Sequence, residues 1–334
     1  MPVINSHNSW SKLEEVWLGD VYPQQWYDHL PAQICDAFQE LTEVTKEDLK
    51  VIGNALKSFG VTVQRPVYQN IDHYIQADTD QLIKPQICPR DQYLTLGNAL
   101  IAHTWHTLPW QHVLQEYHTH ADCKIIPTTN THINGANVVR LGKSLIIDSP
   151  SRETNNISFF DNYQCHWVNN GGHLDACFAI LKPGLLIANS YFSDYDLYFP
   201  NWTKIFLNQP EFARHQKHNR IPHNGKWWLP SLNSNKSFGD HVVKHAQDWV
   251  GNYTETYFEL NCLVIDESNV LMLGQNSSLE KTLKNHGINV HWVPFRTRSF
   301  WDGGLHCLTV DIRRQSTDCV QILDNLNQNY AKSG

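Results

Sequence analysis

The chain has 334 residues, of which 41% are hydrophobic and 18% are charged, as in a globular protein and unlike a disordered one. Its formal net charge is −7 and it has no basic block, which argues against nucleic acid as a partner. No secretory signal is visible, and no apolar run approaches the roughly 20 residues that span a bilayer. The eight cysteines form no C-x-x-C pair. We therefore expect a reduced, cytoplasmic protein with no membrane partner.

A strand and a long helical stretch open the chain. The apolar run at 14–19 predicts a strand. From Pro31 to Phe59 apolar residues recur at steps of three and four, which predicts one or two amphipathic helices that end at Gly60. A strand is expected next, at 61–63. The same order of helix, glycine and strand recurs near the end, at 278–293.

Many short segments between these two regions have strand character and are bounded by Gly, Asn or Pro. The expected strands are 92–96, 100–103, 124–126, 136–141, 144–147, 185–188, 260–265 and 270–273. Strand pairs that alternate with helices indicate an α/β or α+β fold made from a repeated small unit. The segment 208–250 predicts a long irregular excursion, and such loops often act as lids. No linker divides the chain, so we expect a single domain over 1–334.

Two weak signals favour ordinary explanations. The segment 140–144 resembles the end of a phosphate-binding loop, but Gly135 and Gly142 are too far apart, and Gly142 lies where a hairpin turn is expected. His118, His120 and Cys123 could offer metal ligands, but no second cluster has zinc spacing. We expect a turn and surface histidines, with no metal site.

Three segments carry residues suited to chemistry. Cys307 follows Gly303-Gly304-Leu305-His306 and precedes a probable strand at 308–312, which predicts a thiol at the mouth of a strand, outside the core. His173 and Asp175 lie two residues apart, so an extended segment would direct both to one side. Asp91, after Pro89-Arg90, offers another carboxylate at the edge of a strand. A thiol, a histidine and carboxylates are the parts needed to attack a planar cation.

These segments occur in the order of a known family. The motifs are 5–16 (NSHNSWSKLEEV), 88–91 (CPRD), 134–142 (NGANVVRLG), 173–178 (HLDACF) and 303–314 (GGLHCLTVDIRR). Together they resemble the glycine and inosamine amidinotransferase family of the guanidine-modifying pentein superfamily. The resemblance implies an α/β fold, a five-bladed propeller of ββαβ modules around a pseudo-fivefold axis, with the active site in the central channel.

The resemblance also implies a reaction. An amidino group moves from arginine or a related guanidine to a primary amine through an S-amidino intermediate on Cys307, and no cofactor or metal is needed. His173 would exchange protons with the leaving and entering amines. Asp91 and Asp175 would hold the guanidinium, because carboxylates match its planar fork. We expect Arg90, Asn137 and His306 to belong to the same substrate site, and the family suggests a homodimer.

Two departures from the family pattern stand out. Asn134 occupies the position of the carboxylate that orients the catalytic histidine, and Asn137 replaces a further family Asp. Asn134 is kept as a catalytic residue, since Cys-His-Asn arrangements are known to work. The arginine that binds the substrate carboxylate in arginine-using members would align near Phe192 and is missing there. The expected outcome is retuned activity and a donor or acceptor held in an unusual way.

Two other functions remain open on this sequence. One is a guanidine hydrolase of the same fold, related to deiminases, in which water replaces the acceptor amine. The other is a catalytically weak guanidine-binding pentein, which the replacement of two carboxylates by Asn134 and Asn137 makes plausible. The identity of the acceptor is not determined by the sequence.

Overall fold

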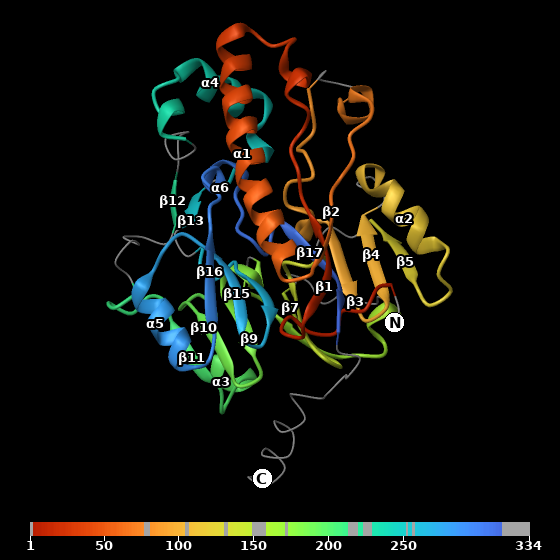
Figure 1. Ribbon diagram of the computed structural model, residues 1–334, viewed down its shortest axis with the longest axis vertical. Helices are drawn as coiled ribbons and strands as arrows, with labels where there is room; N and C mark the ends of the chain where they lie inside the picture. The colour runs from red at the N-terminus through yellow and green to blue at the C-terminus, as the bar shows by residue number, and fades with distance from the viewer. Residues whose placement is uncertain are drawn as a thin grey trace.

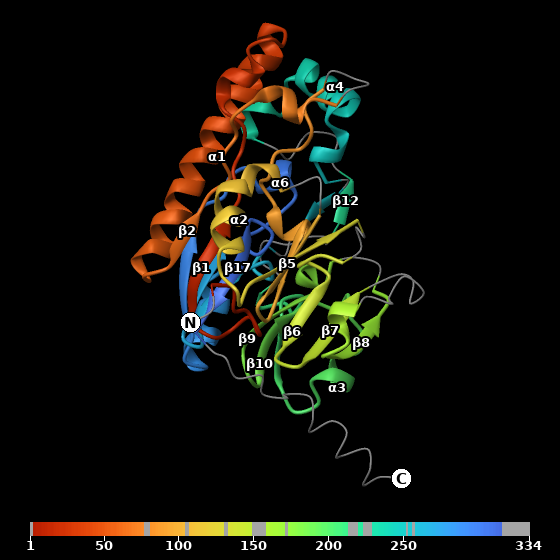
Figure 2. The ribbon, with the colours of Figure 1, turned by 90° about the vertical axis from the view of Figure 1, so that its right-hand side faces the viewer.

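The computed structural model describes residues 3–76, 81–103, 107–129, 133–148, 158–170, 173–212, 220–222, 229–251, 253–255 and 258–315. Five three-stranded sheets are arranged around an axis, with helices on their outer sides (Figures 1 and 2). A sixth, two-stranded sheet joins β12 (Arg220–Pro222) and β13 (Tyr253–Glu255). No described helix is long and apolar enough to cross a membrane.

All five sheets follow one plan, in which the middle strand pairs antiparallel with one neighbour and parallel with the other. The sheets are β17 (Thr309–Arg314), β1 (Leu13–Leu18), β2 (Thr62–Gln64); β3 (Tyr93–Leu96), β4 (Ala99–His103), β5 (Lys124–Thr128); β6 (Val138–Leu141), β7 (Ser144–Asp148), β8 (Gln164–Val168); β9 (Phe178–Lys182), β10 (Leu185–Ala188), β11 (Thr203–Phe206); and β14 (Leu263–Asp266), β15 (Asn269–Leu273), β16 (Asn289–Val293). This plan is the ββαβ module, and its fivefold recurrence confirms the expected propeller.

Helices connect the middle strand to the parallel strand and cover the sheets from outside. They are α1 (Ala32–Ser58), α2 (Gln111–His118), α3 (Tyr195–Tyr198) and α5 (Ser277–Asn285). The predicted helical stretch after Pro31 is one continuous helix, α1, whose buried face includes Phe38, Leu41, Leu49 and Ile52. Gly60 follows it with a φ of +78°, a conformation that ends helices because glycine has no Cβ to clash.

The two ends of the chain close the ring together. Strand β1 from the N-terminal part pairs antiparallel with β17 from the C-terminal part. A bridge between Asn5 and Arg313 and one between Ser6 and Gly97 extend this contact. The first module is therefore assembled from both ends, which brings the segment before β17 to the axis.

Several sequence expectations need correction. The expected strands 136–141 and 260–265 begin too early, because Ala136 and Asn261 lie in loops that turn toward the axis. The segment 208–250 is not irregular throughout, since it contains α4 (Lys236–His245), whose Phe238 packs on Phe38 of α1 with ring centroids 5.0 Å apart. The hairpin turn at Gly142 is confirmed, with φ +72° between β6 and β7.

A buried carboxylate at Asp311 of β17 joins three modules. Its oxygens accept hydrogen bonds from Arg90 Nη1 at 2.8 Å, Arg140 Nη2 at 2.6 Å and Arg314 Nε at 2.8 Å. All four side chains are at most 4% exposed. Burial alone would raise the pKa of Asp311, but the three guanidinium groups lower it well below its usual range.

We expect Asp311→Asn to lower the free energy of unfolding by about 3–5 kcal/mol, because breaking a buried ion pair leaves the partner charges uncompensated. Since the folded-state pKa is lowered, the contribution of Asp311 is complete above about pH 4 and is lost as the pH falls. Urea unfolding at several pH values should show the gap between wild type and variant shrinking in acid. The matched control is Asp196→Asn, which removes a 93% exposed ion-pair partner and should leave stability unchanged. Equal effects of the two substitutions would contradict the role of Asp311.

Candidate active site

The segments before the first strand of each module meet at the axis. Cys307 precedes β17, Asp91 precedes β3, Asn134 precedes β6, Asp175 precedes β9 and Asn261 precedes β14. Backbone hydrogen bonds link neighbours among these segments. Arg90 N donates to Cys307 O, Gly135 N to Arg90 O, Leu174 N to Ala136 O, and His306 N to Asn261 O. The repeat thus delivers one set of side chains per module to a shared centre.

Asn261 holds the proposed nucleophile on two sides. Its Oδ1 accepts a hydrogen bond from the Cys307 backbone N–H at 2.9 Å, and its Nδ2 lies 3.0 Å from Cys307 Sγ. Gly304 permits this contact, because a Cβ there would lie 2.6 Å from Cβ of Asn261. The sequence motifs did not reveal Asn261. The signal that could have done so is its position before the first strand of the fifth module.

The carboxylate of Asp175 contacts the thiol of Cys307. Its Oδ2 lies 3.6 Å from Cys307 Sγ and 2.8 Å from His306 Nδ1. Among the residues that the structure describes, its buried Oδ1 has no hydrogen-bond partner, and the same holds for Oδ1 of Asp91, which lies 3.8 Å from His173 Nδ1. Two buried acceptor oxygens are therefore left to receive the N–H groups of a ligand.

His173 stands at the solvent side of this centre. Its side chain is 42% exposed and that of Asp91 is 30% exposed. Burial alone would lower the pKa of His173, but Asp91, Asp175, Asp302 and Asp148 together raise it. The imidazole is thus favoured as a cation, which can give a proton to a leaving group. The expectation of an extended segment here was wrong, because Leu174–Ala176 forms a 3₁₀ turn that directs His173 toward Asp91 and Asp175 toward His306.

Arg90 and His306 hold the segment that carries Cys307 and the side chain of Asp175 in place. The Arg90 guanidinium is bonded to Asp311 at 2.8 Å and to the His306 carbonyl at 3.2 Å, so it holds the Cys307 segment and does not extend into solvent. Burial and the neighbouring Arg90 lower the pKa of His306. A neutral His306 that donates from Nδ1 fits the ionised Asp175 beside it, whose pKa is lowered by that hydrogen bond against the effect of burial.

Asn134 and Asn137 shape a turn between the modules. Asn134 Oδ1 accepts hydrogen bonds from the backbone N–H groups of Ala136 at 3.0 Å and Asn137 at 3.1 Å. The Asn137 carbonyl accepts a hydrogen bond from Asp148 N at 2.9 Å. Gly135 is required in this turn, because a Cβ there would lie 2.4 Å from Cδ of Arg90. The His173 ring lies 3.8 Å from Asp91, so Asp91 is placed to orient it.

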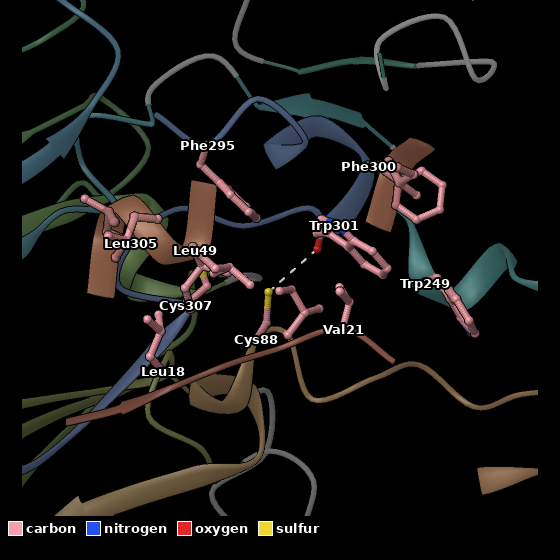
Figure 3. Close-up of a cluster of buried hydrophobic side chains, with 14 of the residues drawn as sticks. Leu18, Val21, Leu49, Cys88, Trp249, Phe295, Phe300, Trp301, Leu305 and Cys307 are labelled. Atoms are coloured by element: carbon pink, nitrogen blue, oxygen red, sulfur yellow. Dashed lines mark hydrogen bonds between the residues drawn. The ribbon is translucent and has the colours of Figure 1, made fainter. Parts of the chain in front are cut away.

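The expectation of a thiol outside the core was wrong. Cys307 is 6% exposed and belongs to the hydrophobic cluster that includes Leu18, Cys88, Trp301 and Leu305, because the loop before β17 packs against these side chains (Figure 3). Burial, Asp175, Asp91 and Cys88 raise the pKa of Cys307 well above the usual range. This direction favours a protonated thiol, which lies between apolar side chains and the carboxylate of Asp175.

A cavity lies beside this centre. Asp175 and His306 line it together with Gly135, Arg140, Val264 and Arg314. Cys307 and His173 do not line it, and the side chains of His173 and Asp91 are partly exposed to solvent.

Known proteins are similar to this chain over most of its length. No protein-family model matches it. An inosamine-phosphate amidinotransferase of Streptomyces glaucescens is 23% identical, with 94% of this chain and 97% of the relative covered. The mitochondrial glycine amidinotransferase of Xenopus tropicalis is 22% identical, with 93% of this chain and 83% of the relative covered.

Solved structures agree on the fold. The inosamine-phosphate amidinotransferase of Streptomyces griseus superimposes with a TM-score of 0.67 at 18% identity, covering 95% of this chain and 98% of the other. The N-terminal domain of a cyanobacterial arginine dihydrolase gives 0.55 at 12% identity, covering 91% and 98%. The similarity over nearly the full length confirms the resemblance to inosamine-phosphate and glycine amidinotransferases, and the solved structures show that the chain has their pentein fold.

Proposed function

We propose that the protein is an amidinotransferase that moves an amidino group from arginine or a related guanidine to a primary amine. The observation that carries this proposal is a pair of buried carboxylate oxygens, on Asp91 and Asp175 near the thiol of Cys307, that have no hydrogen-bond partner among the described residues. A guanidinium group offers planar N–H donors and a positive charge, which match two such acceptors.

The same carboxylates control when Cys307 ionises. Their negative charge raises the pKa of the Cys307 thiol. A bound guanidinium brings a positive charge next to the sulfur and lowers its pKa, so the thiolate forms where the substrate is present.

The chemical steps follow from these positions. As the guanidinium binds, the thiol of Cys307 loses its proton to solvent. The sulfur then forms a bond to the guanidinium carbon, the bond from that carbon to the leaving amine breaks, and the leaving nitrogen takes a proton from His173. The acceptor amine then forms a bond to the same carbon, the carbon–sulfur bond breaks, and His173 takes a proton from the acceptor. Asp91 and Asp175 hold the cation in both steps, and Asn261 keeps the sulfur in place.

The covalent intermediate is the direct test. After mixing with arginine, intact-mass analysis should show one added amidino group, which maps to Cys307. The Cys307→Ala variant should show no adduct and no transfer, while Cys165→Ala, which removes a thiol outside the centre, should behave as wild type. Turnover by Cys307→Ala would end the proposal.

A hydrolase of the same fold is the second candidate, because an arginine dihydrolase domain shares the architecture. Release of citrulline or urea from arginine with no amine present would favour it. New guanidino products that form only with an added amine would favour the transferase.

The raised pKa of Cys307 predicts how the free enzyme reacts with iodoacetamide. Without ligand, alkylation of Cys307 should be slow near pH 7 and should rise roughly tenfold per pH unit up to pH 9, because only the thiolate reacts. Asp91→Asn removes one negative charge near the sulfur, so it should speed alkylation at pH 8. Peptide mapping assigns the label to Cys307. A plateau in rate below pH 8 would show that the thiol is already ionised in the empty site.

Asn261→Ala tests the positioning of the sulfur. Loss of a donor to the thiolate should shift the alkylation profile to still higher pH and slow adduct formation by about 10- to 100-fold, in line with a hydrogen bond to a charged group. Asn276→Ala is the control, since it removes the cap of α5 and the 3.5 Å hydrogen bond from Nδ2 to Glu259 Oε1 without removing a donor to Cys307. An unchanged alkylation profile in Asn261→Ala would mean that the residue has no effect on the thiol.

A further inference from the structure

A second thiol lies beside the proposed nucleophile. Cys88 precedes the 3₁₀ turn Pro89–Asp91, which carries Asp91 to the centre. Its side chain is buried and belongs to the same hydrophobic cluster as Cys307 (Figure 3). Burial is common for a cysteine and needs no function by itself. A thiol next to a nucleophilic sulfur, however, can form a bond to it.

Gly303 lies against both cysteines. A Cβ on Gly303 would be 2.8 Å from Cys88 Sγ, 3.0 Å from Cys307 Cβ and 3.7 Å from Cys307 Sγ. Both sulfurs therefore lie within 3.7 Å of one point. Because glycine has no Cβ, Gly303 leaves this point free, and the two sulfurs can approach each other through it.

Hydrogen bonds hold the two cysteine segments together. The N–H of Arg90, two residues after Cys88, donates to the Cys307 carbonyl at 3.3 Å. The Arg90 Nε donates to the carbonyl of His306 at 3.2 Å, and its Nη1 donates to Asp311 at 2.8 Å. The two segments are thus fixed side by side, so a bond between the sulfurs requires chiefly a change of side-chain rotamer.

The two sulfurs have different hydrogen-bond partners. Besides the acceptor Asp175, Cys307 Sγ has the Nδ2 donor of Asn261 at 3.0 Å, which favours the thiolate. Cys88 Sγ donates to the carbonyl of Trp301 at 3.7 Å, which favours the thiol. Burial raises the pKa of both cysteines. Cys307 is therefore the sulfur that reacts first with an electrophile, and Cys88 keeps its proton until it can bond to Cys307.

We propose that Cys88 is the resolving thiol of Cys307, so that a hydroperoxide converts the pair into an intramolecular disulfide. The Cys307 thiolate takes one oxygen of the hydroperoxide, the O–O bond breaks, and the rest of the peroxide leaves as water or an alcohol. The sulfur of Cys88 then bonds to the sulfur of the resulting sulfenic acid, the S–O bond breaks, and the oxygen leaves as water with the proton of Cys88. The two sulfurs lose two electrons, which reduce the hydroperoxide.

The disulfide makes oxidation of the nucleophile reversible. A sulfenic acid without a neighbouring thiol is oxidised further to a sulfinic acid, which thiols do not reduce. With Cys88 beside it, Cys307 is instead returned to the thiol by exchange with a reducing thiol. The modification needs neither a guanidine nor an amine, so it goes beyond the transfer reaction proposed above.

Oxidation followed by mass spectrometry tests the proposal. The reduced protein is treated with hydrogen peroxide at pH 8, then denatured and alkylated with iodoacetamide. Wild type should lose about 2 Da before alkylation, digestion should yield a peptide pair that joins Cys88 to Cys307, and dithiothreitol should restore alkylation of Cys307. In Cys88→Ser, which keeps a donor to the Trp301 carbonyl, Cys307 should gain about 32 Da, and its recovery with dithiothreitol should fall at least about tenfold.

Two further variants complete the test. Cys88→Ala removes the thiol without adding a hydroxyl to the apolar cluster and should behave as Cys88→Ser. Cys165→Ala removes a half-buried thiol of β8 and should behave as wild type.

Several outcomes would overturn the role of Cys88. One is recovery of Cys307 in both Cys88 variants that equals recovery in wild type. Others are a disulfide from Cys307 to another cysteine or to a second chain, and a wild type in which Cys307 stays reduced or forms sulfinic acid at the rate of the variants. Since no guanidine is added, a missing arginine adduct on Cys307 would overturn the proposed function and leave this result unaffected.

Discussion

The ion cluster at Asp311 is the constraint on which the centre depends. Asp311 in β17 binds Arg90, from the segment before β3, and Arg140 of β6. Arg90 also donates a hydrogen bond to the carbonyl of His306. Buried charges need partners of opposite sign, so the modules cannot separate here without exposing or orphaning a charge. The position of the sulfur follows from this cluster, because Arg90 N donates to Cys307 O and its guanidinium fixes the preceding residue.

Positive groups outnumber carboxylates in the Asp311 cluster, whereas carboxylates predominate around Cys307. The arginines have their negative partner in Asp311, whereas Asp91 and Asp175 each retain an acceptor oxygen that has no hydrogen bond within the described part of the chain, near a thiol whose pKa is raised. Under the proposed function, a bound guanidinium would satisfy these acceptors and would lower the pKa of the thiol at the same time.

Sequence patterns predicted most of the elements and failed in definite places. The strands and the long helix were recognised because apolar periodicity reports burial of one face. The sequence predicts an extended segment at His173–Asp175, whereas Leu174–Ala176 forms a 3₁₀ turn whose geometry depends on hydrogen bonds to the neighbouring module. Asn261 escaped notice, since no local pattern marks an amide that faces a sulfur. Arg90 was expected at the substrate, but its partner Asp311 lies 221 residues away along the chain.

The order of the motifs and the repeat of strand, strand, helix and strand were already determined by the sequence, since both depend on residues that are neighbours along the chain. Only the tertiary structure decided which polar side chains face one another at the axis, and which of them remain available to a ligand. The physical reason is that each module contributes one loop, so every pair that matters joins segments from different modules. The energy of such a pair depends on burial and distance, which arise only when the ring closes between β1 and β17.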